Sequence, residues 1–421
     1  MRRPSKNSPL KLSADSQRLV SLAIAMARAS SRLEERAWEQ QIDALVQKLL
    51  KHHHQETVNT ALDHLFQLEA PAYDALIDCV EAVSSSCVVE HEGKQYDALL
   101  IAIPFLAWTR FSIASGTLAP EVLETTTAHL RAHVLAEETH VALSPLLYSI
   151  DQLPQTHAAT FALTHRMAQA GLLDKPQSLS GAIPETVPFL ADTRYLLATV
   201  IVPTGAPIFR WQTLPFPTNI ASAQTEALRM WQIDMGQVMQ NMLPGCGVEL
   251  LLPEAYYLAC READRRIRPV SIRAAINYLT QALEVDATAL AAVIGGFAQQ
   301  DSTERRIDEY RISFTLQGQT EVIYGVVWPL YGPEEADEDT GDMGGLLFST
   351  PAETIEYRSP LEEIVALLRE CGITDVKIHR ELFQSDFCED CGTPLYLDWD
   401  AELVHAEMPE DLAQGAQQHL H

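Results

Sequence analysis

The chain has 421 residues, 47% hydrophobic and 21% charged, which predicts two or three folded domains and excludes a disordered or coiled-coil protein. It carries 30 Lys and Arg against 57 Asp and Glu, a formal net charge of -27, which disfavours a duplex-binding surface on the body of the chain. Its seven cysteines are too sparse for a secreted disulfide framework, so we expect a cytoplasmic protein.

The first 85 residues have the pattern of short antiparallel helices. Ser31 and Glu34 form a capping box ahead of an amphipathic stretch, and Pro71 suits the first turn of a later helix. The apolar run at 19–27 follows a long basic segment, so we interpret it as a first amphipathic helix rather than part of a cleaved leader. The longest uncharged stretches of the chain contain prolines and are too short to cross a bilayer, so no membrane partner is expected.

From residue 86 onward the pattern changes to strands alternating with helices. Three buried-strand runs, each closed by proline, precede an amphipathic helix and a second strand; the runs are 99–104, 196–203 and 322–329. Residues 120–148 align without a gap on 228–256, and a third copy follows with a one-residue slip. We therefore predict a mixed α/β (α+β) fold in which three related strand–helix–strand units follow the helical segment.

The predicted domain boundaries follow from these units. The helical segment covers 1–85, the three units cover 86–175, 176–300 and 301–385, and the tail covers 386–421. In the second unit we expect helices over 254–266, 270–284 and 287–299. The stretch 334–342 holds six acids and no base among glycines, and we interpret it as a solvated loop rather than a binding lid.

The loops that follow the first strand of each unit form a candidate ligand site. Those strands end at Pro104, Pro203 and Pro329. Open α/β sheets bind ligands at the carboxyl ends of their strands, so these loops predict a pocket for an anionic or planar ligand. Its candidate binding residues are Arg110, Arg210 and Trp211. We favour the simpler interpretation, that proline is a common strand terminator, over this pocket.

A second candidate involves two histidines on the helix predicted from residue 120. His129 and His133 have the i, i+4 spacing that points two imidazoles at one metal ion. No Glu follows His129 as in the metalloprotease motif, and the internal alignment places Gln237 and Asn241 at the equivalent positions. We therefore interpret the pair as the polar flank of a helix.

The strongest chemical signal lies in the tail, where Cys388 and Cys391 form a C-x-x-C-G turn that enters a strand. Two thiolates at this spacing hold one tetrahedral zinc ion, and the glycine lets the chain fold back. No second C-x-x-C follows, so His405 on the expected return strand is the predicted third ligand, and His379 on the preceding strand is the leading candidate for the fourth. The sequence thus predicts a zinc-ribbon-like hairpin within 386–421.

Alternatives to this zinc site remain open at the level of the sequence. Weaker candidates for the fourth ligand are Glu407, His419 and Cys371. A metal-free hairpin is the main alternative, because the ligand set is incomplete. A redox function is disfavoured because Glu389 and Asp390 lie between the cysteines and oppose the lowered thiol pKa that reactive pairs need.

Several common motifs are absent from the sequence. It contains no P-loop, no dinucleotide-binding G-x-G-x-x-G after a strand, no G-x-S-x-G elbow and no H-E-x-x-H. This excludes the nucleotide and hydrolase sites that are most readily recognised from sequence, but not an enzyme with dispersed catalytic residues.

Four segments, at 1–3, 17–45, 388–395 and 404–410, form a distinctive combination at the two ends of the chain. Together they resemble a β-proteobacterial family of domains of unknown function. The likeness runs over nearly the whole chain and is most specific in the cysteine tail. It implies a bacterial cytoplasmic protein and supplies no activity, so no catalytic residue is carried over.

Together these features favour a binding or regulatory module with a structural zinc site, acting on a protein partner or a small anionic ligand. The alternative is an enzyme for a small polar or anionic substrate in a cleft at the carboxyl ends of the strands. Nucleic-acid binding through residues 1–60, which hold ten Lys and Arg and six Asp and Glu, is the weakest hypothesis. The tail opposes it, because residues 381–421 contain ten acids and no Lys or Arg.

Overall fold

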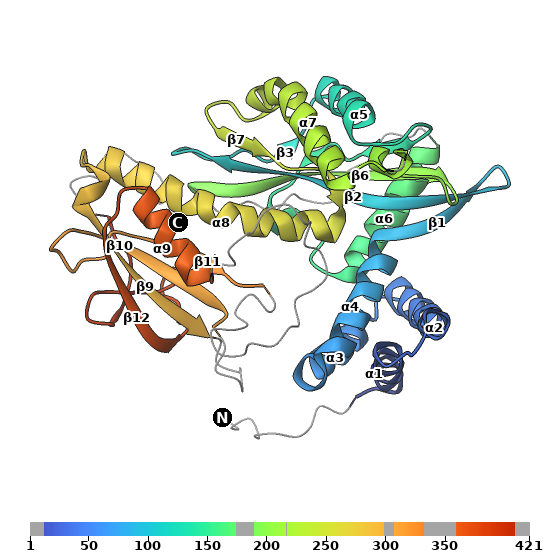
Figure 1. The fold of residues 1–421 in the computed structure, drawn as a ribbon, viewed down its shortest axis with the longest axis horizontal. Coiled ribbons are helices and arrows are strands. Elements are labelled where there is room, and N and C mark those ends of the chain that lie inside the picture. Colours follow the sequence, from blue (N-terminus) through green and yellow to red (C-terminus); the bar gives the residue numbers. More distant parts are fainter. Residues whose placement is uncertain (1–11, 174–188, 216, 299–306, 332–358, 409–421) are drawn as a thin grey trace.

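The computed structural model describes residues 12–173, 189–215, 217–298, 307–331 and 359–408. A helical segment leads into an antiparallel sheet with helices on both faces, and a second sheet follows at the other end of a long helix (Figure 1). The predicted mixed α/β class is confirmed.

The helical segment packs around its own apolar core. Its helices are α1 (Ala14–Ala27), α2 (Arg32–Lys51), α3 (Gln55–Leu68) and α4 (Ala70–Ser85). The predicted cap of α2 is present, since the hydroxyl of Ser31 accepts a hydrogen bond from the Glu34 backbone N–H. Ala158 and Phe161 of α6 (His157–Leu172) enter the same core and so join these helices to the first sheet.

The first sheet is antiparallel at every strand pairing. Its strands are β1 (Ser86–His91), β2 (Lys94–Trp108), β4 (His140–Leu143), β6 (Ala191–Pro203), β7 (Gly247–Leu250) and β8 (Glu254–Ala255). The long strands β2 and β6 pair along their length at its centre, β4 flanks β6, and β1, β7 and β8 share the other edge of β2. A separate short pair joins β3 (Gly116–Thr117) to β5 (Leu146–Leu147).

Both faces of this sheet are buried, because alternate residues of a strand point to opposite sides. Ile103 and Phe105 of β2 pack under α5 (Pro120–His133) and α7 (Ile220–Met242). Leu100 and Ala102 point the other way, toward α6 and α8 (Tyr256–Ala282). The sheet is therefore the middle of three layers (Figure 1), which explains why its central strands are almost continuously apolar.

The prediction that Pro104 ends the first strand is wrong. β2 continues through it to Trp108, and Pro104 pairs with Tyr195 on β6. The carbonyl of Pro104 accepts a hydrogen bond from the backbone N–H of Leu251, in the interruption between β7 and β8. Proline is tolerated there because its missing N–H points toward that same interruption, where no ladder hydrogen bond is lost.

The second sheet has the strand order β11 (Tyr324–Pro329), β10 (Glu309–Leu316), β9 (Leu290–Ala298), β12 (Asp375–Gln384). β9 and β12 are parallel and the other pairs are antiparallel. The helix α9 (Pro360–Glu370) covers one face.

The helix predicted over 287–299 is wrong, because most of that segment is the central strand β9. All nine β9 residues are buried, and a strand buried on both faces carries no polar alternation to distinguish it from an apolar helix. β9 pairs with β10, so these two hydrogen-bonded strands lie on either side of the boundary predicted between residues 300 and 301.

α8 connects the two sheets as one continuous helix rather than the two predicted over 254–266 and 270–284. Pro269 lies inside it, where it removes one helical hydrogen bond without ending the helix. Before Pro269, Ala259 and Ala263 pack on the first sheet, and after it Ile272 and Ile276 pack on the second. The helix therefore sets the spacing between the two sheets (Figure 1).

The elements of the three predicted units occur in the expected order, strand then helix then strand. In the first sheet β4 pairs with β6 and β7 pairs with β2, so the second strand of each of the first two units joins the other unit. In the third unit, β11 and β12 lie at opposite edges of their sheet. Common descent of the three units stays a prediction.

Candidate functional site

The tail forms a compact turn followed by a short hairpin. In the turn, the Cys388 N–H donates to the Thr393 carbonyl at 2.8 Å, and the Gly392 N–H donates to the Cys388 carbonyl at 2.9 Å. Gly392 has a φ of 74°, a conformation that glycine adopts without strain. The hairpin strands β13 (Tyr396–Leu397) and β14 (Leu403–Val404) then bring His405 back beside the turn.

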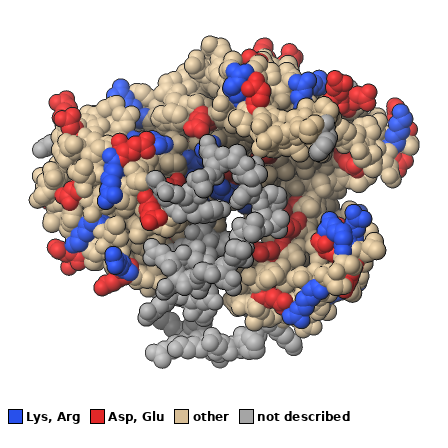
Figure 2. Space-filling view, in the orientation of Figure 1, with Lys and Arg blue, Asp and Glu red and all other residues tan. Residues whose placement is uncertain are grey.

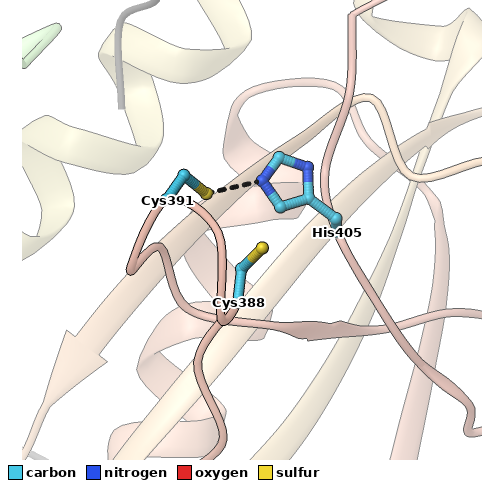
Figure 3. A group of neighbouring side chains, drawn as sticks. All are labelled: Cys388, Cys391 and His405. Carbon is cyan, nitrogen blue, oxygen red and sulfur yellow. Dashed lines mark hydrogen bonds between the residues drawn. The ribbon is translucent and has the colours of Figure 1, made fainter.

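This fold gathers three potential metal ligands at one point. One ligand atom from each of Cys388, Cys391 and His405 lies within 4.8 Å of the other two. The Cys391 Sγ is 3.2 Å from His405 Nε2. Figure 3 shows the two thiols on the turn and the imidazole on the segment just after β14 pointing toward one another. Two thiols and one imidazole form a soft to borderline donor set that fits zinc.

The other candidate ligands lie elsewhere or make other contacts. The Nε2 of His379 lies 3.2 Å from the carbonyl oxygen of Asp398, and His379 is not part of the three-ligand cluster. Cys371 caps the end of α9, and His419 is outside the described residues. Glu407 Oε1 lies 3.4 Å from His405 Nδ1, the ring nitrogen that does not contact Cys391. Among the described residues the cluster thus supplies three ligands and leaves a fourth position open.

The tail is held on the second sheet by close backbone contact. A Cβ on Gly325 would lie 2.2 Å from the ring of Tyr396, and a Cβ on Gly295 would lie 2.2 Å from Leu397 Cδ1. Only glycine at these two positions lets the hairpin approach so closely. The buried Ser313 adds a hydrogen bond, with its hydroxyl donating to the Leu397 carbonyl at 2.5 Å.

Arg311 of β10 holds the cysteine turn from its buried side. Its side chain is fully buried, and its guanidinium lies 2.7 Å from Glu309 Oε1. The Nη1 group donates to the carbonyls of Asp386 and Leu395, at 2.7 and 2.6 Å, at the two ends of the cysteine turn. One buried cation therefore fixes both ends of the segment that carries the thiols.

The hydrogen bonds around Cys391 favour its thiolate. The hydroxyl and then the backbone N–H of Thr393 are the main groups that lower the pKa of Cys391 to about 6, and His405 adds to the effect. Desolvation instead raises the pKa of Cys79 and of Cys260 to about 12. The thiolate is the form that binds metal, so the turn prepares Cys391 as a ligand near neutral pH.

Alkylation of the metal-free protein is expected to show this difference in pKa between Cys391 and the two cysteines Cys79 and Cys260. Because the thiolate is the reactive form, the rate at Cys391 should rise with pH through a midpoint of about 6, whereas Cys79 and Cys260 stay unreactive at pH 7. Peptide mapping after iodoacetamide treatment between about pH 5 and pH 9 measures the rates. A midpoint near the ordinary cysteine value would contradict the proposed hydrogen-bond effect, and added zinc should protect the thiol.

A cavity of about 370 Å³ opens beside the metal-ligand cluster. Its walls come from the start of β6, the middle of α8, the strand β11 and the tail, which contributes Thr393, Pro394, Tyr396, His405 and Ala406. The lining is largely apolar and includes a few polar side chains such as Asp192 and Ser271, the usual composition of a small-molecule site. The sequence contained no signal for this cavity, because its walls are far apart along the chain.

The loops predicted to form one ligand site do not meet at one edge. β2 and β6 are antiparallel, so Trp108 at the end of β2 pairs with Ala191 at the start of β6, while Pro203 pairs with Tyr96. Pro329 ends β11 in the other sheet. The predicted gathering of the three loops is therefore wrong, because it assumed parallel strands.

The three candidate binding residues separate accordingly. Arg210 and Trp211 line a cavity of about 760 Å³ next to α5 and α7, and Arg110 is not among its lining residues. The guanidinium of Arg110 instead lies 5.2 Å from the ring centre of Phe111. The binding roles of all three residues stay predictions.

The surface charges bear on the nucleic-acid alternative. On the face shown in Figure 2, described Lys and Arg side chains are interspersed with Asp and Glu rather than gathered into one basic patch. The acidic stretch 334–342 and the basic residues before position 12 are outside the described residues. No helix in the described part of the chain has the length and apolarity needed to cross a membrane.

Comparison with known proteins identifies one family. The model of a family described as "Protein of unknown function (DUF2863)" matches residues 4–419. No curated protein and no solved structure matches the chain. The resemblance inferred from the two ends of the sequence is thereby confirmed. Because the match spans nearly all of the sequence, the protein belongs to the DUF2863 family.

Proposed function

We propose that this protein is a zinc-stabilised binding module, in which a zinc ion held by Cys388, Cys391 and His405 fixes the tail as one wall of a small-molecule pocket. The proposal rests mainly on His405, which belongs to the ligand cluster and also lines the cavity of about 370 Å³. A cytoplasmic location is part of this proposal and rests on the sparse, odd-numbered cysteine set.

Zinc suits the chemistry and the position of these ligands. Thiolate and imidazole donors select zinc over hard ions such as magnesium or calcium. A bound ion would join residues 388 and 391 of the turn to residue 405 beyond the hairpin, closing a loop in the way that a disulfide does. The chemistry that zinc supplies here is structural, and a water would complete its coordination. Glu407, on the Nδ1 side of His405, would orient the imidazole from outside the ligand set.

The pocket favours a small ligand with a mainly apolar body. A volume of about 370 Å³ is within the range of small-molecule sites, and most of its wall is aliphatic or aromatic. Asp192, Thr393 and His405 provide polar contacts on two sides. Burial raises the pKa of the Asp192 carboxyl, although the adjacent Arg194 opposes this shift. The ligand proposed for this mostly apolar pocket therefore differs from the anionic ligand predicted from the sequence.

Anilinonaphthalene sulfonate, a fluorescent dye with an apolar aromatic body and one sulfonate group, tests whether the pocket binds ligands. Replacing Ser271 with Trp fills the cavity from α8 and is expected to weaken dye binding by at least about tenfold, or about 1.4 kcal/mol. Asn277→Trp, on the exposed side of the same helix, is the matched control. Circular dichroism verifies that each variant is folded. Equal dye affinity in the parent and Ser271→Trp proteins would refute the pocket.

The same titration tests the role of zinc. Removing the metal with a chelator, or replacing Cys391 with Ser, is expected to lower dye affinity in the pocket because the tail loses its fixed position. Pocket binding that is unaffected by either change would show that zinc does not shape this wall.

A further inference from the structure

A second cluster of metal-ligating side chains lies on the opposite face of the first sheet from α8. His129 and His133 are on α5, one helical turn apart, and Asp234 is on α7, which packs beside α5. The two imidazole rings are stacked, with centres 6.1 Å apart and planes at 12°. All three side chains are partly buried, with exposed fractions of 14% for His133, 25% for His129 and 36% for Asp234.

The distances place one carboxylate oxygen in front of both imidazoles. Asp234 Oδ2 lies 2.6 Å from His133 Nε2 and 3.9 Å from His129 Nδ1. One ligand atom from each residue lies within 4.8 Å of the other two. Ligands bound at roughly 2.0–2.1 Å from a first-row metal ion are about 3 Å apart, so small side-chain movements would give all three a common ion.

The surroundings favour a cation at this point. His133 also lines the cavity of about 760 Å³, whose other charged lining residues are Glu137, Glu138, Glu226 and Arg210. These are three acids and one arginine. Glu226 is paired with Arg229, and the Arg210 guanidinium donates to the Ala132 carbonyl at the end of α5, so the lining keeps a net excess of acid. The hydrogen bond between His133 and Asp234 accounts for the position of His133. It does not account for His129, whose imidazole also lies beside the carboxylate.

We propose that His129, His133 and Asp234 form a second site, for a divalent first-row transition-metal ion, with its open coordination positions directed to the cavity. Two imidazoles and one carboxylate leave several positions free, unlike a closed structural site. Nitrogen and oxygen donors select iron, cobalt, nickel or zinc in the divalent state rather than magnesium or calcium. A water molecule or a small anionic ligand could complete the coordination from the cavity side.

The sequence indicated two of these three ligands. The i, i+4 spacing of the histidines was visible, but the third ligand comes from a helix about 100 residues later. The internal alignment places Gln237 and Asn241 of α7 at the positions equivalent to the two histidines. The α7 residue that contacts the histidines is instead Asp234. Only the packing of α5 against α7 identifies it.

Cobalt(II) titration by calorimetry tests this site in the full chain. The experiment uses a Cys388→Ser, Cys391→Ser background so that the tail cannot contribute. We expect about one cobalt ion per chain, and a loss of affinity of at least about 100-fold when Asp234 is replaced with Ala, which exceeds typical outer-shell effects. Asp234→Asn, which keeps the side-chain volume, and His129→Gln are added in case the alanine variant fails to fold.

A surface-histidine variant is the matched control. His52, His53 and His54 are consecutive and exposed, and replacing all three with Ala should leave the stoichiometry unchanged. Absence of stoichiometric cobalt binding in the tail-variant background, or binding that survives both Asp234→Asn and His129→Gln, would overturn the proposal.

The two metal sites can be distinguished by their spectra. Cobalt in the tail should give thiolate-to-metal charge-transfer absorption, whereas cobalt at His129, His133 and Asp234 should not. A parent chain that binds cobalt without any thiolate band would refute the proposed zinc site and leave this inference intact.

Discussion

Replacing both Cys388 and Cys391 with serine is expected to loosen the tail on the second sheet. Structural zinc supplies roughly 10–16 kcal/mol in small zinc-finger peptides. Here Arg311 and the contacts of Tyr396 and Leu397 also hold the tail. We therefore expect a smaller loss of local stability within 386–408, at least about 3 kcal/mol.

Hydrogen–deuterium exchange measures this loss directly. The amides of Cys388 and Gly392 donate hydrogen bonds within the turn and should exchange much faster in the double variant, while amides of β9 keep their protection. Cys371→Ser is the matched control, because this partly buried cysteine lies outside the cluster. Unchanged protection of the turn in the double variant would contradict a structural role for the metal site.

Replacing Arg311 with alanine is expected to be the most destabilising single change in the second sheet. It would leave Glu309 without its buried partner and the carbonyls of Asp386 and Leu395 without their donor. Breaking one side of a buried ion pair costs about 3–5 kcal/mol. Arg311 also lies over the Phe297 ring, at 4.4 Å from its centre, so apolar packing is lost as well.

Urea denaturation measures this cost, with Arg380→Ala as the control. Arg380 is exposed on β12 in the same sheet, and its loss should change the free energy of unfolding by no more than about 0.5 kcal/mol. Arg311→Lys should be intermediate, because lysine keeps the charge but lacks the planar donor geometry. A loss below about 1 kcal/mol for Arg311→Ala would show that the buried cation does not anchor the turn.

Features determined by neighbouring residues could be predicted from the sequence. The cap of α2 depends on Ser31 and Glu34, which are one helical turn apart. Likewise, Cys388 and Cys391 are separated by a single turn, and a short hairpin was enough to anticipate that His405 would return to them. Local chemistry therefore predicted the three-residue ligand cluster, although not the identity of a fourth ligand.

Features that depend on distant pairing could not be predicted in this way. The antiparallel arrangement of β2 and β6 is fixed between strands about 100 residues apart, and it separates the loops after Pro104 and Pro203. The segment 290–298 reads equally as helix or strand until β10 and β12 are seen to pair with it. The wall of the cavity beside His405 and the position of Asp234 likewise arise only from tertiary packing.

The zinc content of the purified chain tests the central claim most directly. Elemental analysis of protein prepared without added metal should find about one zinc more per chain in the parent than in the Cys388→Ser, Cys391→Ser variant, because a structural site is nearly filled. A difference below about 0.2 zinc per chain would contradict the proposed zinc-stabilised tail.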